Sequence, residues 1–366
     1  MESVIANNYL SRYARDSYAR EADDSHNTEG MIDCALGINP YGSPPSVQVP
    51  LRRLLLERYP APDPLLVSAI ATRWSSVANL STSNVQLECG AFGVIERIGK
   101  LLIEPGCLVL GYSPQFPDFA GEVSQRGGRC DFVALRPEDG YRFNAEDFIT
   151  YISEKYRLIY IDNPNNPTGQ VIPLWDLESI VKTAEQLRIA VLVDEAYGEF
   201  MPDECSAIGL IRKYDNLFVA RSFSKGWGLP GLRAGYAVMS DSLLPLWRKI
   251  DHPFPVSGIS QNIAGQALLD DQFIDDCVRR IARGKISVLD SCRRLEPFLT
   301  DNNVPIFALR HPDSGVDLCR EFSSRSVHTF SASHFVGLDQ NSVRIRIPVE
   351  VDALVRAIES IEHDIK

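Results

Sequence analysis

The sequence lacks long apolar runs, and basic residues are fewer than acidic ones. Its 366 residues include 37 Lys and Arg against 48 Asp and Glu, which gives a formal net charge of −11. Nucleic-acid backbones are bound by clustered basic residues, so we expect no nucleic-acid partner. No apolar stretch approaches the length that spans a bilayer, so we expect no membrane insertion either.

Closely spaced cysteines are absent as well. The eight cysteines are scattered singly, without a C-x-x-C pair or another spacing typical of zinc sites. Cys34, Cys89, Cys107 and Cys130 lie in or beside apolar stretches, where a reduced cysteine packs as a small hydrophobic side chain. Residues 1–28 are polar and charged, unlike a secretory signal peptide, and we therefore expect a cytoplasmic location.

What the sequence does contain is a regular alternation of strand-like and helical stretches from residue 85 to residue 239. Residues 189–194 are apolar without polar alternation, which is typical of a parallel strand covered on both faces. The alternation predicts an α/β fold with a mainly parallel, doubly wound sheet and helices on both sides. Within it, residues 89–93 are expected to form a turn and residues 94–103 a helix.

Beyond residue 240 the pattern becomes helical, and residues 261–295 are expected to form one or more long helices. We therefore divide the chain into an N-terminal arm, residues 1–30, a large domain, residues 31–295, and a small α+β domain, residues 296–366. The last helices of the large domain, from residue 241, are expected to bridge to the small one.

Candidate chemistry begins with the stretch SFSKGWGLPGLR, residues 222–233. It places Lys225 among small and hydroxyl residues, with Arg233 eight positions later. Burial beside a second cation favours the unprotonated amine, which is the form that attacks carbonyl carbons. Taken alone, the stretch is equally compatible with a glycine-rich turn that carries a solvated lysine.

Two further polar motifs follow predicted strands, where open α/β sheets bind their ligands. NPNNPTG, residues 163–169, comes after the strand that ends at Asp162, and Asp194 closes the strand 189–194, followed by Glu-Ala-Tyr197. A carboxylate at the end of an apolar strand needs a cation or a hydrogen-bond donor. A protonated pyridine nitrogen would meet that need for Asp194, and the alternative is a helix N-cap.

These motifs together identify a resemblance. NPNNPTG, DEAY, SFSKGWGLPGLR and the later RIR at residues 344–346 resemble, in order and spacing, the pyridoxal-phosphate enzymes of fold type I in the class I/II aminotransferase superfamily. The chain is similar to the branch that contains histidinol-phosphate aminotransferase and threonine-phosphate decarboxylase. The resemblance covers residues 32–365 and implies pyridoxal 5′-phosphate as the cofactor and an amino acid as the substrate.

The resemblance also implies roles around the cofactor ring. Lys225 is expected to form the Schiff base and to move the proton at Cα, and Asp194 to pair with the pyridine nitrogen. Asn166 and Tyr197 are expected to hydrogen-bond the 3′-oxygen of the ring. Phe116 occupies the place of the aromatic residue that stacks on the ring, with a core phenylalanine as the alternative.

Further roles concern the phosphate, the substrate and a second subunit. Asn39 and Arg344 are expected to hold the substrate carboxylate, Arg344 by a bidentate fork. Tyr59 resembles the tyrosine that reaches the phosphate in the neighbouring subunit, which implies a homodimer. The cofactor phosphate is expected to accept hydrogen bonds from backbone N–H groups at a helix start, those of Gly90, Ala91 and Phe92. It is also expected to contact the side chains of Ser222, Ser224 and Arg233.

The small domain departs from the pattern of this branch. Histidinol-phosphate aminotransferases carry an arginine there that receives the substrate phosphate, whereas this chain has Thr329 near the expected place. We therefore expect an unphosphorylated substrate. The roles of His334 and of Arg346, which stands where a small hydroxyl residue is common, are left open.

The arm, residues 1–30, is the second departure. In this superfamily the segment before the first strand often folds across the mouth of the active site. Here it carries carboxylates together with Ser25 and His26. The carboxylates suit a cationic substrate side chain such as guanidinium, and Ser25 and His26 suit added acid–base chemistry. A solvated polar loop is the alternative.

We therefore expect a pyridoxal-phosphate enzyme that acts at Cα of an unphosphorylated α-amino acid, with a cationic side chain as one option. Its simplest activity is amino transfer. The alternative is a dehydratase and cyclase that converts a hydroxyarginine into a cyclic guanidino amino acid of the enduracididine or capreomycidine type. A decarboxylase is disfavoured by the missing phosphate-binding arginine, and a binding protein without turnover by the presence of both Lys225 and Asp194.

Overall fold

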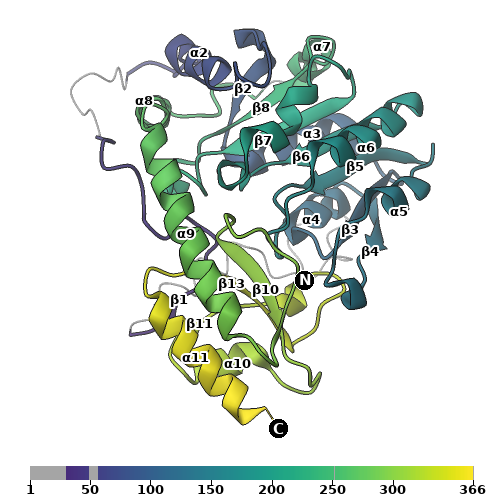
Figure 1. Ribbon diagram of the computed structural model, residues 1–366. Helices are drawn as coiled ribbons and strands as arrows, with labels where there is room; N and C mark the ends of the chain where they lie inside the picture. Colours follow the sequence, from purple (N-terminus) through teal and green to yellow (C-terminus); the bar gives the residue numbers. More distant parts are fainter. Residues whose placement is uncertain (1–29, 49–56, 251, 366) are drawn as a thin grey trace, which may run out of the picture.

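Residues 30–48, 57–250 and 252–365 are described by the computed structural model. They form a larger body around a seven-stranded sheet and a smaller body around a four-stranded sheet. The long helix α9 (Asp271–Ser291) runs from the larger body along the smaller one, where it packs beside the C-terminal helix α11 (Val351–Asp364) (Figure 1).

The seven-stranded sheet has the order β2-β8-β7-β6-β5-β3-β4. Among these strands β8 runs antiparallel to both neighbours and the other pairings are parallel, so the prediction of a mainly parallel sheet is confirmed. The strands are β2 (Val85–Glu88), β3 (Leu108–Ser113), β4 (Arg129–Ala134), β5 (Tyr156–Asp162), β6 (Ala190–Asp194), β7 (Leu217–Ser222) and β8 (Gly235–Met239).

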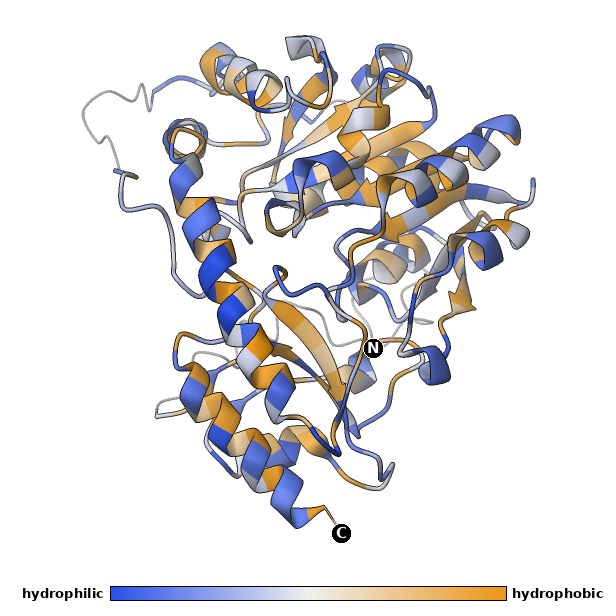
Figure 2. Ribbon diagram, in the orientation of Figure 1, coloured by the Kyte–Doolittle hydropathy of each residue, from blue (hydrophilic) through white to orange (hydrophobic). Residues whose placement is uncertain are grey.

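Helices cover both faces of this sheet. Alternate residues of its central strands point to opposite faces and accordingly belong to two separate apolar cores. Figure 2 shows the apolar strands in orange between helices whose outer faces are blue. No helix in the described part of the chain is both long and apolar enough to cross a bilayer. One face is covered by α2 (Pro64–Arg73), α5 (Ala145–Thr150), α6 (Leu174–Gln186) and α8 (Gly258–Ala267), and the other by α3 (Gly90–Leu102), α4 (Pro117–Gln125) and α7 (Leu244–Trp247).

Helix α3 begins earlier than the sequence predicted. Residues 89–93 were expected to form a turn, but the helix starts at Gly90. Two glycines in its first turn lower the helix propensity that a sequence shows. Ala91, Val94 and Ile95 are nevertheless buried in the core beneath α3, so packing against the sheet outweighs that loss.

The smaller body is an antiparallel sheet with the order β12-β13-β10-β9. Its apolar core lies between the sheet and the helices α9, α10 and α11, with Val288, Phe307 and Ile345 among its buried residues. Its elements are β9 (Glu296–Pro297), β10 (Ile306–Arg310), α10 (Leu318–Ser323), β12 (Phe330–Ser331) and β13 (Ser342–Arg346).

A segment from the N-terminal side completes the smaller body. Strand β1 (Ile32–Asp33) pairs in parallel with β11 (Val327–His328), and Cys34 is buried in the same core. Arg346 fastens this segment, because its guanidinium donates to the backbone oxygen of Asp33 and lies 3.3 Å from the Asp33 carboxylate. We therefore propose that the small domain also includes residues 32–34, which the sequence had assigned to the large one.

Lys285 on α9 fixes the segment that leads into β10. Its side chain is fully buried, and its Nζ lies 2.6 Å from Thr300 Oγ1, 2.7 Å from the Asp301 oxygen and 2.8 Å from the oxygens of Val304 and Ile306. The same segment touches the NPNNPTG loop, because the Asp301 N–H donates to the Gly169 oxygen at 3.0 Å. Lys285 therefore links α9 to the edge of the functional loop.

We expect Lys285→Met to destabilise the fold by roughly 2–4 kcal/mol, because two buried backbone oxygens, a third partly buried one and a hydroxyl would lose their common donor. Urea unfolding of the purified protein measures this change. The control is Lys182→Met at an exposed position of α6, which should change the free energy of unfolding by less than about 0.5 kcal/mol. Equal effects of the two substitutions would contradict the role given to Lys285.

Candidate active site

A cavity of about 670 Å³ lies beyond the carboxyl ends of β5, β6 and β7, next to the starts of α3 and α4. This is the edge at which open α/β sheets bind ligands. The cavity therefore brings together most of the side chains that the sequence motifs singled out. These are Ala91, Phe92, Phe116, Asn166, Asp194, Tyr197, Ser222, Ser224, Lys225 and Arg233.

One end of the cavity is suited to an anion of the size of a phosphate. Gly90 opens α3 at φ +72°, and a Cβ at this position would lie 3.0 Å from a terminal nitrogen of Arg233. Arg233 in turn approaches the Ser224 hydroxyl at 3.4 Å, and the Ser224 N–H donates to the Ser222 hydroxyl at 3.0 Å. A helix start, two hydroxyls and a guanidinium thus converge, which is an arrangement that binds phosphate groups.

Asp194, the last residue of β6, is a buried carboxylate that lines the cavity. Burial raises its pKa to about 6, and the neighbouring Asp162 adds to this rise, while hydrogen bonds from Tyr160 Oη (2.9 Å) and the Ala196 N–H (3.0 Å) act against it. Within the described residues, no Lys or Arg forms an ion pair with Asp194. A protonated pyridine nitrogen would supply the missing cation, so this carboxylate fits a pyridoxal ring.

A strap formed by residues 35–39 lies against Lys225. Asn39 donates its backbone N–H to the Lys225 oxygen (3.1 Å) and its side-chain Nδ2 to the Gly226 oxygen (2.7 Å). The Tyr197 hydroxyl occupies the space that a Cβ at position 37 would need, and Lys225 Nζ lies 5.5 Å from the centre of the Tyr197 ring. The strap therefore holds the backbone at Lys225 and Gly226 and packs against the Tyr197 hydroxyl. The contact of Asn39 with a substrate carboxylate stays a prediction.

Arg344 reaches the site from β13 of the smaller body. Its fully buried guanidinium donates to Asn166 Oδ1 (3.1 Å) and to the Ala35 oxygen (2.5 Å). Because the carboxamide oxygen of Asn166 accepts from Arg344, its N–H groups are the part of this side chain that is left to serve the cavity. The arginine thus orients one of the predicted cofactor ligands.

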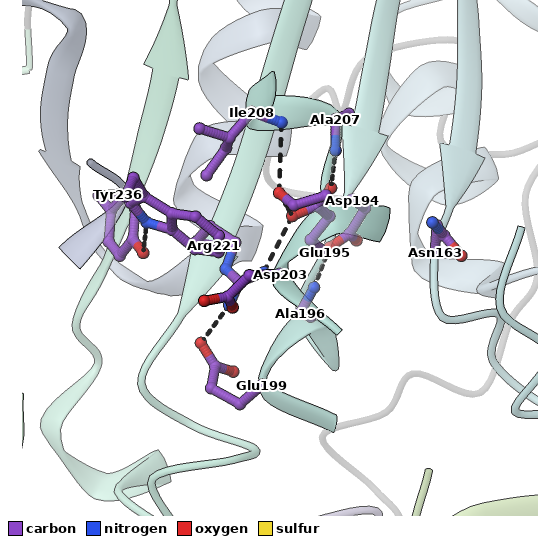
Figure 3. Close-up of polar contacts among 12 residues, drawn as sticks. Asn163, Asp194, Glu195, Ala196, Glu199, Asp203, Ala207, Ile208, Arg221 and Tyr236 are labelled. Carbon is purple, nitrogen blue, oxygen red and sulfur yellow. Dashed lines mark hydrogen bonds and ion pairs between the residues drawn. The ribbon is translucent and has the colours of Figure 1, made fainter. Parts of the chain in front are cut away.

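An ion network behind the site was missed by the sequence reasoning. Arg221 of β7 lies between two buried carboxylates, 2.9 Å from Glu195 Oε2 and 2.7 Å from Glu199 Oε1 (Figure 3). Glu199 packs against Gly226, where a Cβ would collide with it. Neighbouring residues of a strand face opposite sides, so Arg221 points away from the cavity that Ser222 lines. This alternation is the one sequence signal that could have indicated the network.

Some predicted residues lie elsewhere. Tyr59 is 82% exposed and stacks on Phe254 with ring centres 5.0 Å apart, so it lies outside the cavity of its own subunit. Thr329 is buried and donates its hydroxyl to the Cys319 sulfur, and His334 lies beside Phe330. Ser25 and His26 fall outside the described residues. The homodimer and the roles of the arm stay predictions.

Comparisons with known proteins agree on one family. A family model described as aminotransferase class I and II matches residues 53–361. The chain is 29% identical over 326 residues to a histidinol-phosphate aminotransferase of Methanococcus maripaludis strain C5, covering 87% of this chain and 86% of that protein. It is 32% identical over 254 residues to the histidinol-phosphate aminotransferase of Halorubrum lacusprofundi, covering 68% of each.

Solved structures share the fold. The histidinol-phosphate aminotransferase of Sinorhizobium meliloti in complex with pyridoxal 5′-phosphate aligns with a TM-score of 0.83 at 21% identity, over 100% of both chains. The aspartate aminotransferase of Thermus thermophilus with maleate aligns with a TM-score of 0.85 at 16% identity, over 98% of this chain and 99% of that one. The fold-type prediction is therefore confirmed.

The raised pKa of Asp194 predicts a pH-dependent stability of the ligand-free protein. Between pH 4 and pH 6 the folded state keeps a proton on Asp194 that the unfolded state has released, so this group lowers stability as the pH rises. Asp194→Asn removes the effect. We expect the difference in free energy of unfolding, variant minus wild type, to become more positive by roughly 3 kcal/mol from pH 4 to pH 7. A difference that does not change with pH would contradict this account.

Proposed function

The chain belongs to the class I and II aminotransferase family, and from this premise we propose that it transfers the amino group of an unphosphorylated α-amino acid with a positively charged side chain. Its cofactor is pyridoxal 5′-phosphate. The observation that carries the choice of substrate is the composition of the cavity wall, to which Glu96, Asp118 and Glu122 contribute carboxylates.

The residues of the cavity fit the cofactor along its whole length. The start of α3 with Ser222, Ser224 and Arg233 suits the phosphate, and Asp194 suits the ring nitrogen. Phe116 suits the ring face, while Asn166 and Tyr197 suit the ring oxygen. When bound, the cofactor supplies a carbonyl carbon that amines attack and a conjugated ring that accepts the electron pair left at Cα.

Lys225 is the base and acid of the proposed mechanism. Its amine takes the proton from Cα of the substrate and returns a proton during the transfer. Asn39 holds the backbone at Lys225 and Gly226, so the lysine side chain starts from a fixed point. The ionised Asp194 keeps the proton on the ring nitrogen, which makes the ring a better electron acceptor.

Arg344 is suited to orient the substrate. A guanidinium binds an α-carboxylate through two parallel N–H donors, and this two-point contact fixes the orientation of the Cα–H bond. Arg344 is already hydrogen-bonded to Asn166 and to the strap at Ala35. In the proposed mechanism, binding of the carboxylate is therefore linked to the residues that hold the ring and Lys225.

The acidic wall supports a cationic side chain. Asp118 is 7% exposed and lies in the first turn of α4, and Glu122 follows one turn later. Partial burial and the nearby Glu122 raise the pKa of Glu96, whereas Arg126, which forms an ion pair with Glu122, acts against this rise. A guanidinium or ammonium group of the substrate would be attracted to these carboxylates, whereas a phosphate would be repelled by them.

The second candidate is amino transfer from histidinol phosphate, which is supported by the names of the relatives that are 29% and 32% identical. In this chain Thr329 is near the place expected for the phosphate-binding arginine of the branch, and its hydroxyl donates to the Cys319 sulfur. The cavity wall also includes three carboxylates of α3 and α4, those of Glu96, Asp118 and Glu122. Both points favour the unphosphorylated, cationic substrate.

A substrate panel tests this choice. With a keto acid as acceptor, we expect kcat/KM for arginine or lysine to exceed that for histidinol phosphate at least about tenfold. Mass analysis of the products separates the remaining alternatives. A product of hydroxyarginine that is lighter than it by one water and forms without a keto acid would indicate the dehydratase and cyclase. Selective turnover of histidinol phosphate would contradict the proposal of a cationic substrate.

Asp118→Asn should weaken turnover of cationic substrates. We expect kcat/KM for arginine to fall roughly tenfold, because one charge-assisted contact is lost, while kcat/KM for methionine changes by less than about twofold. Steady-state kinetics with both substrates measures the difference. The control is Asp131→Asn, at a carboxylate on β4 outside the cavity. An equal loss for both substrates would argue against a contact with the substrate charge.

Lys225→Ala tests the assignment of the catalytic lysine. We expect borohydride to fix the cofactor covalently to wild-type protein at residue 225 and not to the variant, and turnover to fall at least about 10³-fold. Lys213→Ala, at a lysine whose side chain is 61% exposed, should keep both properties. Retained turnover in the Lys225 variant would overturn the mechanism.

A further inference from the structure

Asp162 is a buried carboxylate of the cavity to which the steps above give no task. It ends β5 and pairs in register with Asp194, which ends β6. Two carboxylates thus lie side by side on the strand ends beneath the space for the cofactor. Within the described residues, neither of them forms an ion pair with Lys or Arg.

The two oxygens of Asp162 serve two different groups of donors. Oδ2 accepts the backbone N–H of Phe116 (3.2 Å) and that of Asn166 (3.0 Å). Oδ1 accepts from Tyr112 Oη (2.7 Å) and from Asn165 Nδ2 (3.0 Å). One carboxylate therefore joins the loop after β3, which carries Phe116, to the loop after β5, which carries Asn166.

This arrangement requires a group that only accepts hydrogen bonds. An asparagine at position 162 would direct its NH₂ either at two backbone N–H groups or at the NH₂ of Asn165. Both orientations leave buried donors facing each other, which a side chain of the same size cannot relieve by a small shift. The choice of Asp over Asn thus has a specific physical reason.

The charge of Asp162 also acts on its neighbour. Asp162 raises the pKa of Asp194, and burial raises the pKa of Asp162 itself. The two carboxylates together therefore favour a nearby positive charge more strongly than one would alone. The titratable groups around the pair are Tyr112 from β3, Tyr160 from β5, Glu195 after β6, and, lining the same cavity, Tyr197, Lys225, Arg233, Glu96, Asp118 and Glu122.

We infer that Asp162 is a positioning residue of the active site: it holds the Phe116 and Asn166 loops on one carboxylate and adds a second negative charge beneath the cofactor ring. This inference rests on the proposed use of pyridoxal 5′-phosphate at this cavity. It makes Asp162 act through Phe116, Asn166 and Asp194 rather than through contact with the substrate.

The test compares Asp162→Asn with wild type by titration with pyridoxal 5′-phosphate at several pH values. We expect the dissociation constant to rise roughly tenfold or more, because in either amide orientation the NH₂ of the introduced asparagine would face buried donors that Asp162 accepts in the wild type. We also expect the pH at which the visible absorbance of the bound cofactor changes to fall by about one unit, because removing a negative charge makes a nearby cation release its proton more easily.

Two further variants make the outcome decisive. Asp131→Asn also removes a carboxylate that a tyrosine hydroxyl contacts, Tyr156 Oη at 3.2 Å, but outside the cavity, and it should leave both readouts unchanged. Asp162→Thr removes the charge without adding an N–H group, so it serves if the Asn variant does not fold, and it should lower the absorbance midpoint in the same direction. Circular dichroism verifies folding of each variant.

The possible failures are distinct. If folded Asp162 variants keep both the wild-type dissociation constant and the wild-type absorbance midpoint, the inference about Asp162 is wrong and the proposed function is untouched. If affinity falls while the midpoint stays, the charge effect is wrong. If wild-type protein does not bind pyridoxal 5′-phosphate, the proposed function itself fails.

Discussion

Burial of carboxylates at one edge of the sheet is the constraint on which the rest of this structure depends. Each one must meet a cation or several donors, because an ionised group out of water is otherwise very unfavourable. Asp162 meets uncharged donors from two loops, and Glu195 meets the guanidinium of Arg221. Asp194 accepts two hydrogen bonds and has a raised pKa, so a cationic ligand beside it would stabilise its ionised form.

The sequence predicted the framework and the motifs because both are local. Apolar strands between helical stretches indicated the doubly wound sheet, and short motifs after β2, β3, β5, β6 and β7 indicated many of the cavity residues. It did not predict contacts between distant segments, such as Arg221 between Glu195 and Glu199, or Lys285 with the backbone oxygens of Val304 and Ile306. The start of α3 was misplaced for the same reason, since its two glycines are compensated by packing that no local pattern reports.

The site is also where the two bodies of the molecule meet. Arg344 belongs to the small sheet, yet it binds Asn166 of the large body and the strap at Ala35. The strap then continues to Asn39, which holds the backbone at Lys225. In the proposed mechanism, a substrate carboxylate bound by Arg344 would therefore act on the same hydrogen bonds that hold the backbone at Lys225.

The contact between Tyr197 and Gly37 has a consequence for the evolution of this chain. The Tyr197 hydroxyl packs directly against the backbone of Gly37, and a single methyl group at position 37 would displace it. Any residue larger than glycine at position 37 would therefore require the Tyr197 side chain to move. A laboratory that seeks new specificities by saturation mutagenesis should leave this codon alone and vary the walls instead.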